Sequence, residues 1–270
     1  MKRIRYKKIV EIVLWVFGLS SIFFLLSFVN KKENDIKGRN ITIKISDESE
    51  LSFVSEEDVI EFLQKRKDTL INHSVHKSNF YEIEKSLNAH PAISKANIAV
   101  DINGDVRIKL EQRNPIVRIF NLQGESFYID AEKKLMPLSD NYAARVPVAS
   151  GHIAEWYSLF YPISIDELET DSSLTSISCL DDIYRVAEYL QKDSAMGALI
   201  HQLYITKEGE IELYPAVGNH KILFGKGEDV EEKFKKLKIF YTEGLNSLNS
   251  WNNYSAINLK FRNQVICIKK

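Results

Sequence analysis

The sequence predicts an α+β protein that begins with a single membrane helix. Three observations lead to this prediction. First, a long uncharged stretch follows a basic N-terminal tip. Second, the patterns in residues 41–115 indicate a strand, two helices and two further strands, in that order. Third, residues 116–270 alternate apolar and polar residues in short runs that are interrupted by two helical stretches. A period of two indicates strands and a period near 3.6 indicates helices. Short strands joined by polar turns favour a mainly antiparallel β domain.

The N-terminal stretch has the features of an uncleaved anchor at residues 9–30. Five of the first eight residues are basic, and no residue from Ile12 to Val29 is charged. About 20 apolar residues make a helix of about 30 Å, which matches a bilayer core. A cleaved signal peptide has a shorter apolar region and a small-residue cleavage site, whereas this run ends in SFVNKKEND. The basic tip, residues 1–8, predicts a cytoplasmic N-terminus and an exported remainder.

Charge and composition exclude several classes of protein. Without the basic tip and Glu11 the chain carries 31 basic and 36 acidic residues, a net charge of −5. No cluster of Lys and Arg offers a face for nucleic acid.

Residues 31–40 (KKENDIKGRN) are charged and polar and are typical of a tether. Cys179 and Cys267 permit one disulfide in an oxidising compartment, and their spacing leaves the pairing open.

The predicted first domain, residues 41–115, contains two amphipathic helices. The first follows a capping-box candidate, Ser55 with Asp58 three residues later. The second covers residues 79–91, where Pro91 enforces its end. A strand at 41–45 precedes the helices. Two alternating runs follow them and are joined by Asn103-Gly104, a strong signal for a hairpin turn.

The predicted second domain, residues 116–270, consists mainly of short strands. Strands are expected at 116–120, 126–130 and 135–139, within 144–151, three times within 201–225, and at the C-terminus. Helices are expected at 181–192 and 228–241, the second acidic first and basic last, as the helix dipole favours. Residues 157–178 have no steady period and are interpreted as a long excursion.

The search for catalytic and metal-binding signatures finds none. His73 and His76 have an H-x-x-H spacing without a partner ligand, so two solvated histidines are the preferred interpretation over a metal site. The stretch FGKGED at 224–229 departs from the phosphate-loop pattern, because His occupies position 220 and Gly follows Lys226. No G-x-S-x-G elbow is present. The sequence gives no support to an enzyme and predicts no cofactor.

Taken in order, the motifs resemble the bacterial cell-division family FtsQ, also called DivIB. The family's acidic-x-basic-x-Pro pattern is matched by Glu111, Arg113 and Pro115, and its Tyr-x-Asp turn by Tyr128 and Asp130. The family's Gly-rich turn and last helix correspond to the stretch FGKGEDVEEKFKKLKIF. Its D-L-R-Y strand corresponds to NLKF at 258–261, where Asn, Lys and Phe replace Asp, Arg and Tyr. MPLSDNYAARVPVASG resembles the Bacteroidetes branch.

The resemblance implies a fold and a role. Residues 41–115 would form a POTRA domain, and residues 116–270 a β domain with C-terminal partner-binding strands. The protein would be a non-enzymatic scaffold in the inner membrane at the division site, bound to FtsB- and FtsL-like proteins with one membrane span. The POTRA domain would contact further division proteins. No metal or cofactor is implied.

The resemblance also implies a site at the C-terminal strands, where a partner adds a strand to an open edge. The residues that it assigns to partner binding are Leu259, Lys260, Phe261, Asn263, Val265, Ile266 and Cys267. Two alternatives remain open from the residues themselves. The terminal strands can pair internally and leave no edge, and Leu259, which alternates with Phe261, can be a core residue.

Two other functions are weighed against the scaffold. A POTRA-bearing secretion or outer-membrane assembly protein would need a large downstream barrel of many strands, for which too few residues remain. A membrane-anchored periplasmic hydrolase would need a site that no motif reveals, although a fold alone does not fix function.

Overall fold

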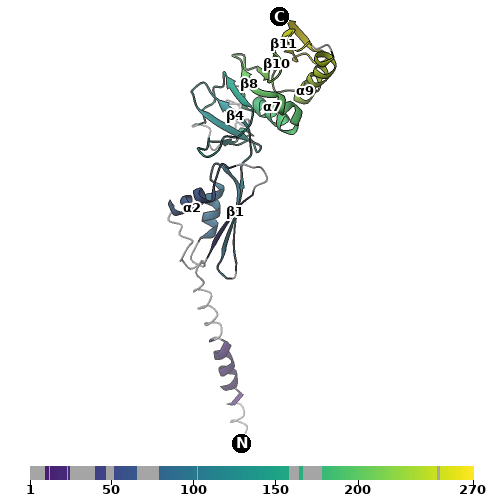
Figure 1. Cartoon of the computed structure of the whole chain (residues 1–270). Coiled ribbons are helices and arrows are strands. Elements are labelled where there is room, and N and C mark those ends of the chain that lie inside the picture. Colours follow the sequence, from purple (N-terminus) through teal and green to yellow (C-terminus); the bar gives the residue numbers. More distant parts are fainter. Residues whose placement is uncertain are drawn as a thin grey trace. The chain divides into compact units, whose positions relative to one another are not determined.

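The structure, a computed structural model, divides into two compact units (Figure 1). It describes residues 10–11, 13–22, 24, 40–46, 52–65, 79–101, 103–157, 164–166, 178–247 and 250–270. The first unit comprises Met1–Ser46 and Val54–Glu111, and the second comprises Asp47–Phe53 and Gln112–Lys270.

Several predicted segments lie partly or wholly outside the described residues. The predicted tether, the H-x-x-H stretch at 73–76 and most of the excursion at 157–178 are among them. In the predicted anchor, the described residues between 10 and 24 are helical and carry exposed apolar side chains. Across the described part of the chain, no helix combines the length and the apolar character that crossing a membrane requires.

The first unit contains a three-stranded sheet with two helices, in the predicted chain order. Its strands are β1 (Ile41–Ser46), β2 (Ile93–Val100) and β3 (Val106–Gln112). The order in the sheet is β1-β3-β2, and β1 runs parallel to β3, with Ile43 opposite Ile108. Gly104, at the turn between β2 and β3, has φ of 86°, a conformation that glycine adopts without steric cost.

Local sequence signals set the ends of the two helices, α2 (Glu56–Lys65) and α3 (Phe80–Asn88). The capping box is confirmed: Ser55 Oγ accepts the N–H of Asp58 at 3.1 Å, and Asp58 Oδ2 accepts the N–H of Ser55 at 2.9 Å. The helices bury an apolar stripe, consisting of Val59, Leu63, Ile83 and Leu87. This face packs on the sheet and forms the core of the unit.

The second unit is built on one nine-stranded sheet in the order β12-β11-β10-β9-β8-β7-β4-β5-β6. The strands are β4 (Pro115–Phe120), β5 (Ser126–Asp130), β6 (Leu135–Met136), β7 (Val148–Gly151), β8 (Ile200–Ile205), β9 (Ile211–Pro215), β10 (Lys221–Gly225), β11 (Tyr254–Asn258) and β12 (Ile266–Lys269). Neighbouring strands are antiparallel except for three parallel pairs, β4 with β7, β7 with β8, and β10 with β11. The sheet is therefore mainly antiparallel, as expected, with parallel pairings in the middle that the sequence did not reveal.

The prediction of two helices in this unit is incomplete. The described residues contain α7 (Leu180–Lys192), α8 (Ser194–Leu199), α9 (Val230–Ile239) and a π-helix, η2 (Phe240–Asn246). The short α8 was missed because it lies directly behind α7. It packs so closely there that a Cβ on Gly197 would meet the carbonyl of Leu190 at 2.5 Å.

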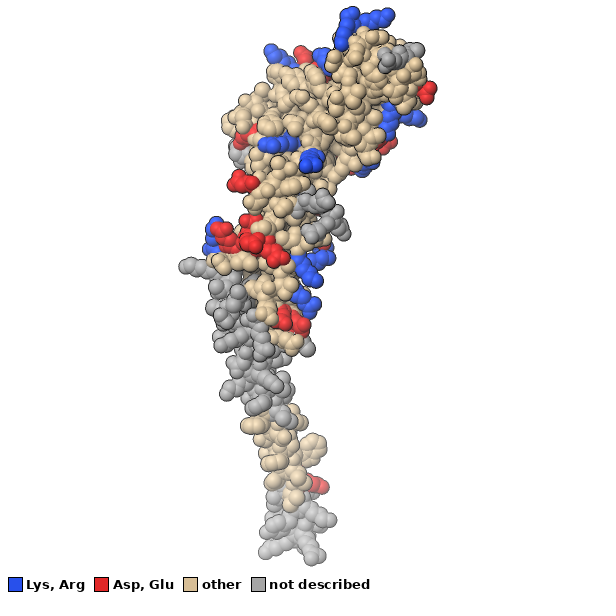
Figure 2. All heavy atoms as spheres, in the orientation of Figure 1, with Lys and Arg blue, Asp and Glu red and all other residues tan. Residues whose placement is uncertain are grey.

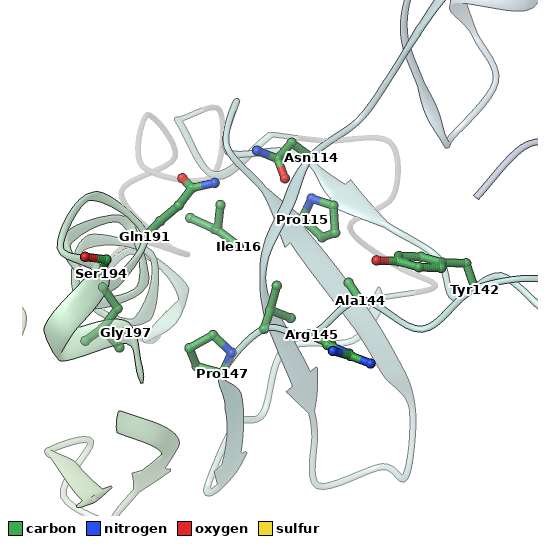
Figure 3. Close-up of a pocket in the computed structure, with 12 residues that line it drawn as sticks. Asn114, Pro115, Ile116, Tyr142, Ala144, Arg145, Pro147, Gln191, Ser194 and Gly197 are labelled. Atoms are coloured by element: carbon green, nitrogen blue, oxygen red, sulfur yellow. The ribbon is translucent and has the colours of Figure 1, made fainter. Parts of the chain in front are cut away.

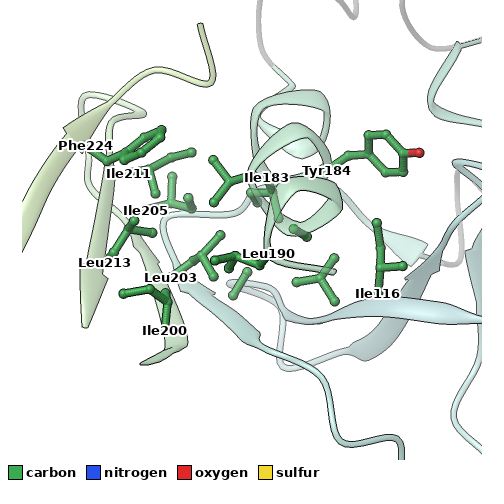
Figure 4. Packing of buried hydrophobic residues seen from close by; sticks show 14 of the residues in the cluster. Ile116, Ile183, Tyr184, Leu190, Ile200, Leu203, Ile205, Ile211, Leu213 and Phe224 are labelled. Atoms are coloured by element: carbon green, nitrogen blue, oxygen red, sulfur yellow. The ribbon is translucent and has the colours of Figure 1, made fainter. Parts of the chain in front are cut away.

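The core of the second unit lies between the sheet and α7 (Figure 4). Ile183 and Leu190 of α7 point toward Ile205 and Leu213 of the sheet, and all four are at most 2% exposed. Phe224 and Phe234 extend this core toward α9, with ring centroids 5.1 Å apart. Ile257 of β11 belongs to this core, and Cys267 of β12 packs against it, so the core extends to the C-terminal edge.

Candidate functional site at the C-terminal edge

The last strand, β12, forms one edge of the nine-stranded sheet. It pairs antiparallel with β11, and within the described residues no strand lies on its other side. The two terminal strands therefore pair with each other, yet an edge remains open. Figure 1 shows β11 next to the C-terminus.

The hydrogen bonds of β12 show which of its main-chain groups are free. Lys270 N donates to Asn253 O at 3.2 Å, and the carbonyl of Ile268 accepts from the Ser255 hydroxyl on β11. Main-chain groups alternate in direction along a strand. The N–H groups of Cys267 and Lys269 therefore point away from β11, toward the open side of the sheet.

The strand that precedes this edge is shorter than predicted. β11 ends at Asn258, and residues 259–265 form a loop instead of continuing the alternation through Phe261. Lys236 of α9 holds this loop, because its ammonium group donates to the carbonyls of Leu259 at 3.2 Å and Phe261 at 2.6 Å. The cation from α9 satisfies carbonyls that a longer strand would have paired with main chain.

The structure separates the residues that were predicted to bind a partner. Leu259 is fully buried in the core, so the alternative interpretation of this residue is correct and its side chain is not available to a partner. Val265 and Cys267 pack partly against the same core, and burial raises the pKa of the Cys267 thiol. Lys260 and Asn263 lie exposed in the loop.

Three apolar side chains are exposed at the edge. Phe261 is 45% exposed in the loop, and Ile266 and Ile268 are 39% and 48% exposed on the face of β12 turned away from the core. Ile266 is among the residues assigned to partner binding, and Ile268, which alternates with it, is not.

Basic side chains surround the edge. Lys260 pairs with Glu210, whereas Arg262, Lys269 and Lys270 are exposed and form no ion pair with a described residue. Figure 2 shows basic side chains at the tip where the C-terminus lies in Figure 1. An edge of this composition favours an acidic strand and disfavours a second basic one.

Two of the sequence motifs meet far from this edge, where β3 leads into β4. Arg113 Nη1 lies 2.7 Å from Asp130 Oδ2, and both side chains are almost completely buried. The other carboxylate oxygen of Asp130 accepts the N–H groups of Glu132 and Lys134, at 2.9 and 2.8 Å. Arg113 of the first motif and Asp130 of the second are thus joined by a buried ion pair, and Asp130 holds the turn after β5.

The described residues offer little for covalent or metal chemistry. No three His, Cys, Asp or Glu side chains among them are grouped to hold a metal ion. Cys179 and Cys267 are both free thiols, so the open question of a disulfide is answered against pairing. Burial, together with the nearby Glu155 carboxylate, raises the pKa of Cys179, which keeps this thiol protonated and unreactive. What the arrangement can do is pair main chain with main chain.

Comparison with known families accounts for both units. Residues 37–111 match the model of a POTRA-like domain, and residues 114–268, more than half of the chain, match the model described as FtsQ/DivIB, C-terminal related. No curated protein matches the chain. The order of the two domains and the motif residues at their junction agree with these matches, and the chain therefore belongs to the FtsQ/DivIB family of bacterial cell-division proteins.

Proposed function

We propose that this protein is a non-enzymatic scaffold of the division septum that holds a small partner with one membrane span, of the FtsB or FtsL kind, by strand addition to β12. The N-terminal segment anchors the chain in the inner membrane, with residues 31–270 on the outer side. The observation that carries the proposal is the open edge of β12 on a sheet whose core extends to that edge.

The free edge offers each element that strand addition needs. The N–H groups of Cys267 and Lys269 supply main-chain donors, and the side chains of Ile266 and Ile268 supply an apolar face beside them. The positive charges of Arg262, Lys269 and Lys270 favour a partner strand with acidic side chains. An edge of this kind is an aggregation hazard when it stays uncovered, so a stable partner also protects the protein.

A proline substitution at the edge tests the proposal directly. Lys269→Pro removes one outward N–H and places a ring where the partner strand would lie, and the position tolerates it because no bond to β11 is lost. Lys269→Gln removes the charge alone. Each full-length variant is expressed in place of the original protein, and the partner that crosslinks and co-purifies with it from membranes is quantified.

We expect Lys269→Pro to reduce partner recovery at least about fivefold, since one main-chain hydrogen bond contributes about 1 kcal/mol and the ring adds a clash. Lys269→Gln is expected to change recovery by no more than about twofold, because an exposed charge contributes little. Thermal unfolding of both variants checks that the sheet is intact. Full recovery with Lys269→Pro, in a folded chain, would place the partner elsewhere and refute the strand-addition mechanism.

A further inference from the structure

A cavity of about 360 Å³ lies in the second unit, between the beginning of β4, the segment 142–147 and the end of α7 (Figure 3). In Figure 3, Tyr142 and Arg145 lie on one side of it, Gln191 and Ser194 on the other, and β4 between them. The volume is at the lower end of the range for ligand sites, enough for a few side chains.

The walls of the cavity are apolar and rigid. Ile116 and Leu190 are at most 2% exposed and belong to the core. Pro115 and Pro147 flank them with fixed φ angles, and the carbonyl of Pro147 accepts the N–H of Arg118 at 2.9 Å. A wall that is already ordered loses little entropy when a ligand binds, so the cavity is preformed for binding.

The rim, in contrast, carries polar side chains with unused hydrogen-bonding groups. Asn114, Arg145, Gln191 and Ser194 are exposed, and none of their side chains bonds to another described residue. Among the described residues, Arg145 is the only charged one that lines the cavity, and its guanidinium has no carboxylate partner there. The site therefore has one uncompensated positive charge above an apolar floor.

We propose that this cavity binds an extended peptide segment of a partner protein, in which a carboxylate side chain lies next to an apolar residue. The carboxylate forms a bidentate pair with Arg145, for which the planar guanidinium is suited. The apolar neighbour rests on Ile116 and Leu190, and the amides of Asn114 and Gln191 bond to the main chain of the peptide. A single cation balances a single carboxylate, which favours this ligand over a phosphate with its larger charge.

The cavity is a second binding site, independent of the edge strand. Six strand spacings separate β12 from β4 in the sheet, a distance of about 29 Å. One partner strand at β12 therefore leaves the cavity open. The scaffold can hold two different segments at once, and the failure of one proposal does not decide the other.

The test uses the full-length chain in detergent and two fluorescein-labelled peptides, acetyl-Gly-Leu-Glu-Pro-Gly-amide and its Leu-Gln-Pro counterpart, with binding followed by anisotropy. Arg145→Gln removes the proposed anchor. Arg262→Gln makes the same change of charge at an exposed arginine near β12 and is the matched control. Ala144→Trp fills the cavity without changing its charge, and a photoreactive version of the peptide locates the site by mass spectrometry.

We expect the Glu peptide to bind about ten- to a hundredfold more tightly than the Gln peptide, as a charge-assisted hydrogen bond predicts. Arg145→Gln and Ala144→Trp remove this preference, whereas Arg262→Gln and Lys269→Pro keep it, and the crosslink falls on residues 142–147. Equal binding of the two peptides, no binding of either at millimolar concentration, or insensitivity to Arg145→Gln would overturn the proposal. Competition by acetate at the same concentration as the peptide would reduce the site to a simple anion site and also overturn it.

Discussion

Replacing Asp130 with Asn tests how the buried ion pair with Arg113 stabilises the second unit. The pair joins Arg113 Nη1 to Asp130 Oδ2 at 2.7 Å, and the side chains are 9% and 2% exposed. Asn keeps an oxygen for the N–H groups of Glu132 and Lys134. It replaces the charged oxygen with an amide N–H that faces the guanidinium, so the substitution removes both the charge pairing and the acceptor of the Arg113 hydrogen bond.

The magnitude follows from the burial of the pair. Leaving one member of a buried pair without its partner costs about 3–5 kcal/mol. Glu132 lies 3.3 Å from the same nitrogen of Arg113 but is more than half exposed, and it recovers about 1 kcal/mol at most. The net loss for Asp130→Asn is therefore about 2–4 kcal/mol, or about 5–15 °C in Tm for a unit of this size. Asp130→Ala also removes the acceptor of two N–H groups and should cost about 2 kcal/mol more.

Urea unfolding of the detergent-solubilised full chain, followed by tryptophan fluorescence, measures this loss, because Trp156 and Trp251 both lie in the second unit. The double variant Arg113→Met with Asp130→Asn removes both buried charges. It should recover at least half of the stability that Asp130→Asn loses, since no charge is left without a partner. A loss below about 1 kcal/mol for Asp130→Asn, or strictly additive effects in the double variant, would refute the reasoning.

Three further predictions follow from other positions. Burial lowers the pKa of His220, so the folded state keeps this side chain neutral. The second unit should therefore lose stability as pH falls below about 6.5, where the unfolded chain takes up a proton at this residue. In urea unfolding at a series of pH values, His220→Gln should remove this part of the pH dependence. Gly151 has φ of 106°, and a Cβ atom there would collide with a carbonyl of β8, so Gly151→Ala should lower Tm sharply. Gly124 has φ of 82° but lies in open space, so Gly124→Ala should cost only about 1 kcal/mol. Lys236→Met should speed hydrogen exchange in the loop between β11 and β12 and weaken partner recovery, because the bonds to the two loop carbonyls are lost. The free energy of unfolding should change by less than about 1 kcal/mol. The control Lys235→Met should change neither hydrogen exchange nor partner recovery.

Features that depend on neighbouring residues were predictable from the sequence. The capping box of Ser55 and Asp58, the end of α3 before Pro91 and the turn at Gly104 each rest on contacts within a few residues. Their energies do not depend on what the rest of the chain does. The strand-helix-helix-strand-strand order of the first unit follows from them. The short alternating runs in residues 116–270 predicted the mainly antiparallel sheet of the second unit, and the order of short motifs indicated the family.

The features that decide the candidate site arise from residues far apart in the chain. Leu259 and Phe261 have the same alternation in sequence, yet one is buried and the other exposed, because β11 ends at Asn258 and both lie in the loop that Lys236 of α9 holds by their carbonyls. Alternation indicates that the two faces of a strand differ, but it does not show which face meets the core, and a shift of one residue exchanges them.

The cavity and the ion pair both depend on pairing between segments. Arg145 and Gln191 line one cavity because β7 pairs in parallel with β4 and α7 packs against β4. Arg113 meets Asp130 because β4 pairs with β5. The sequence by itself determined the local elements, their order and the family. The tertiary structure alone decided which edge stays open and which charges find partners, because burial and long-range pairing depend on the arrangement of the whole unit rather than on any one segment.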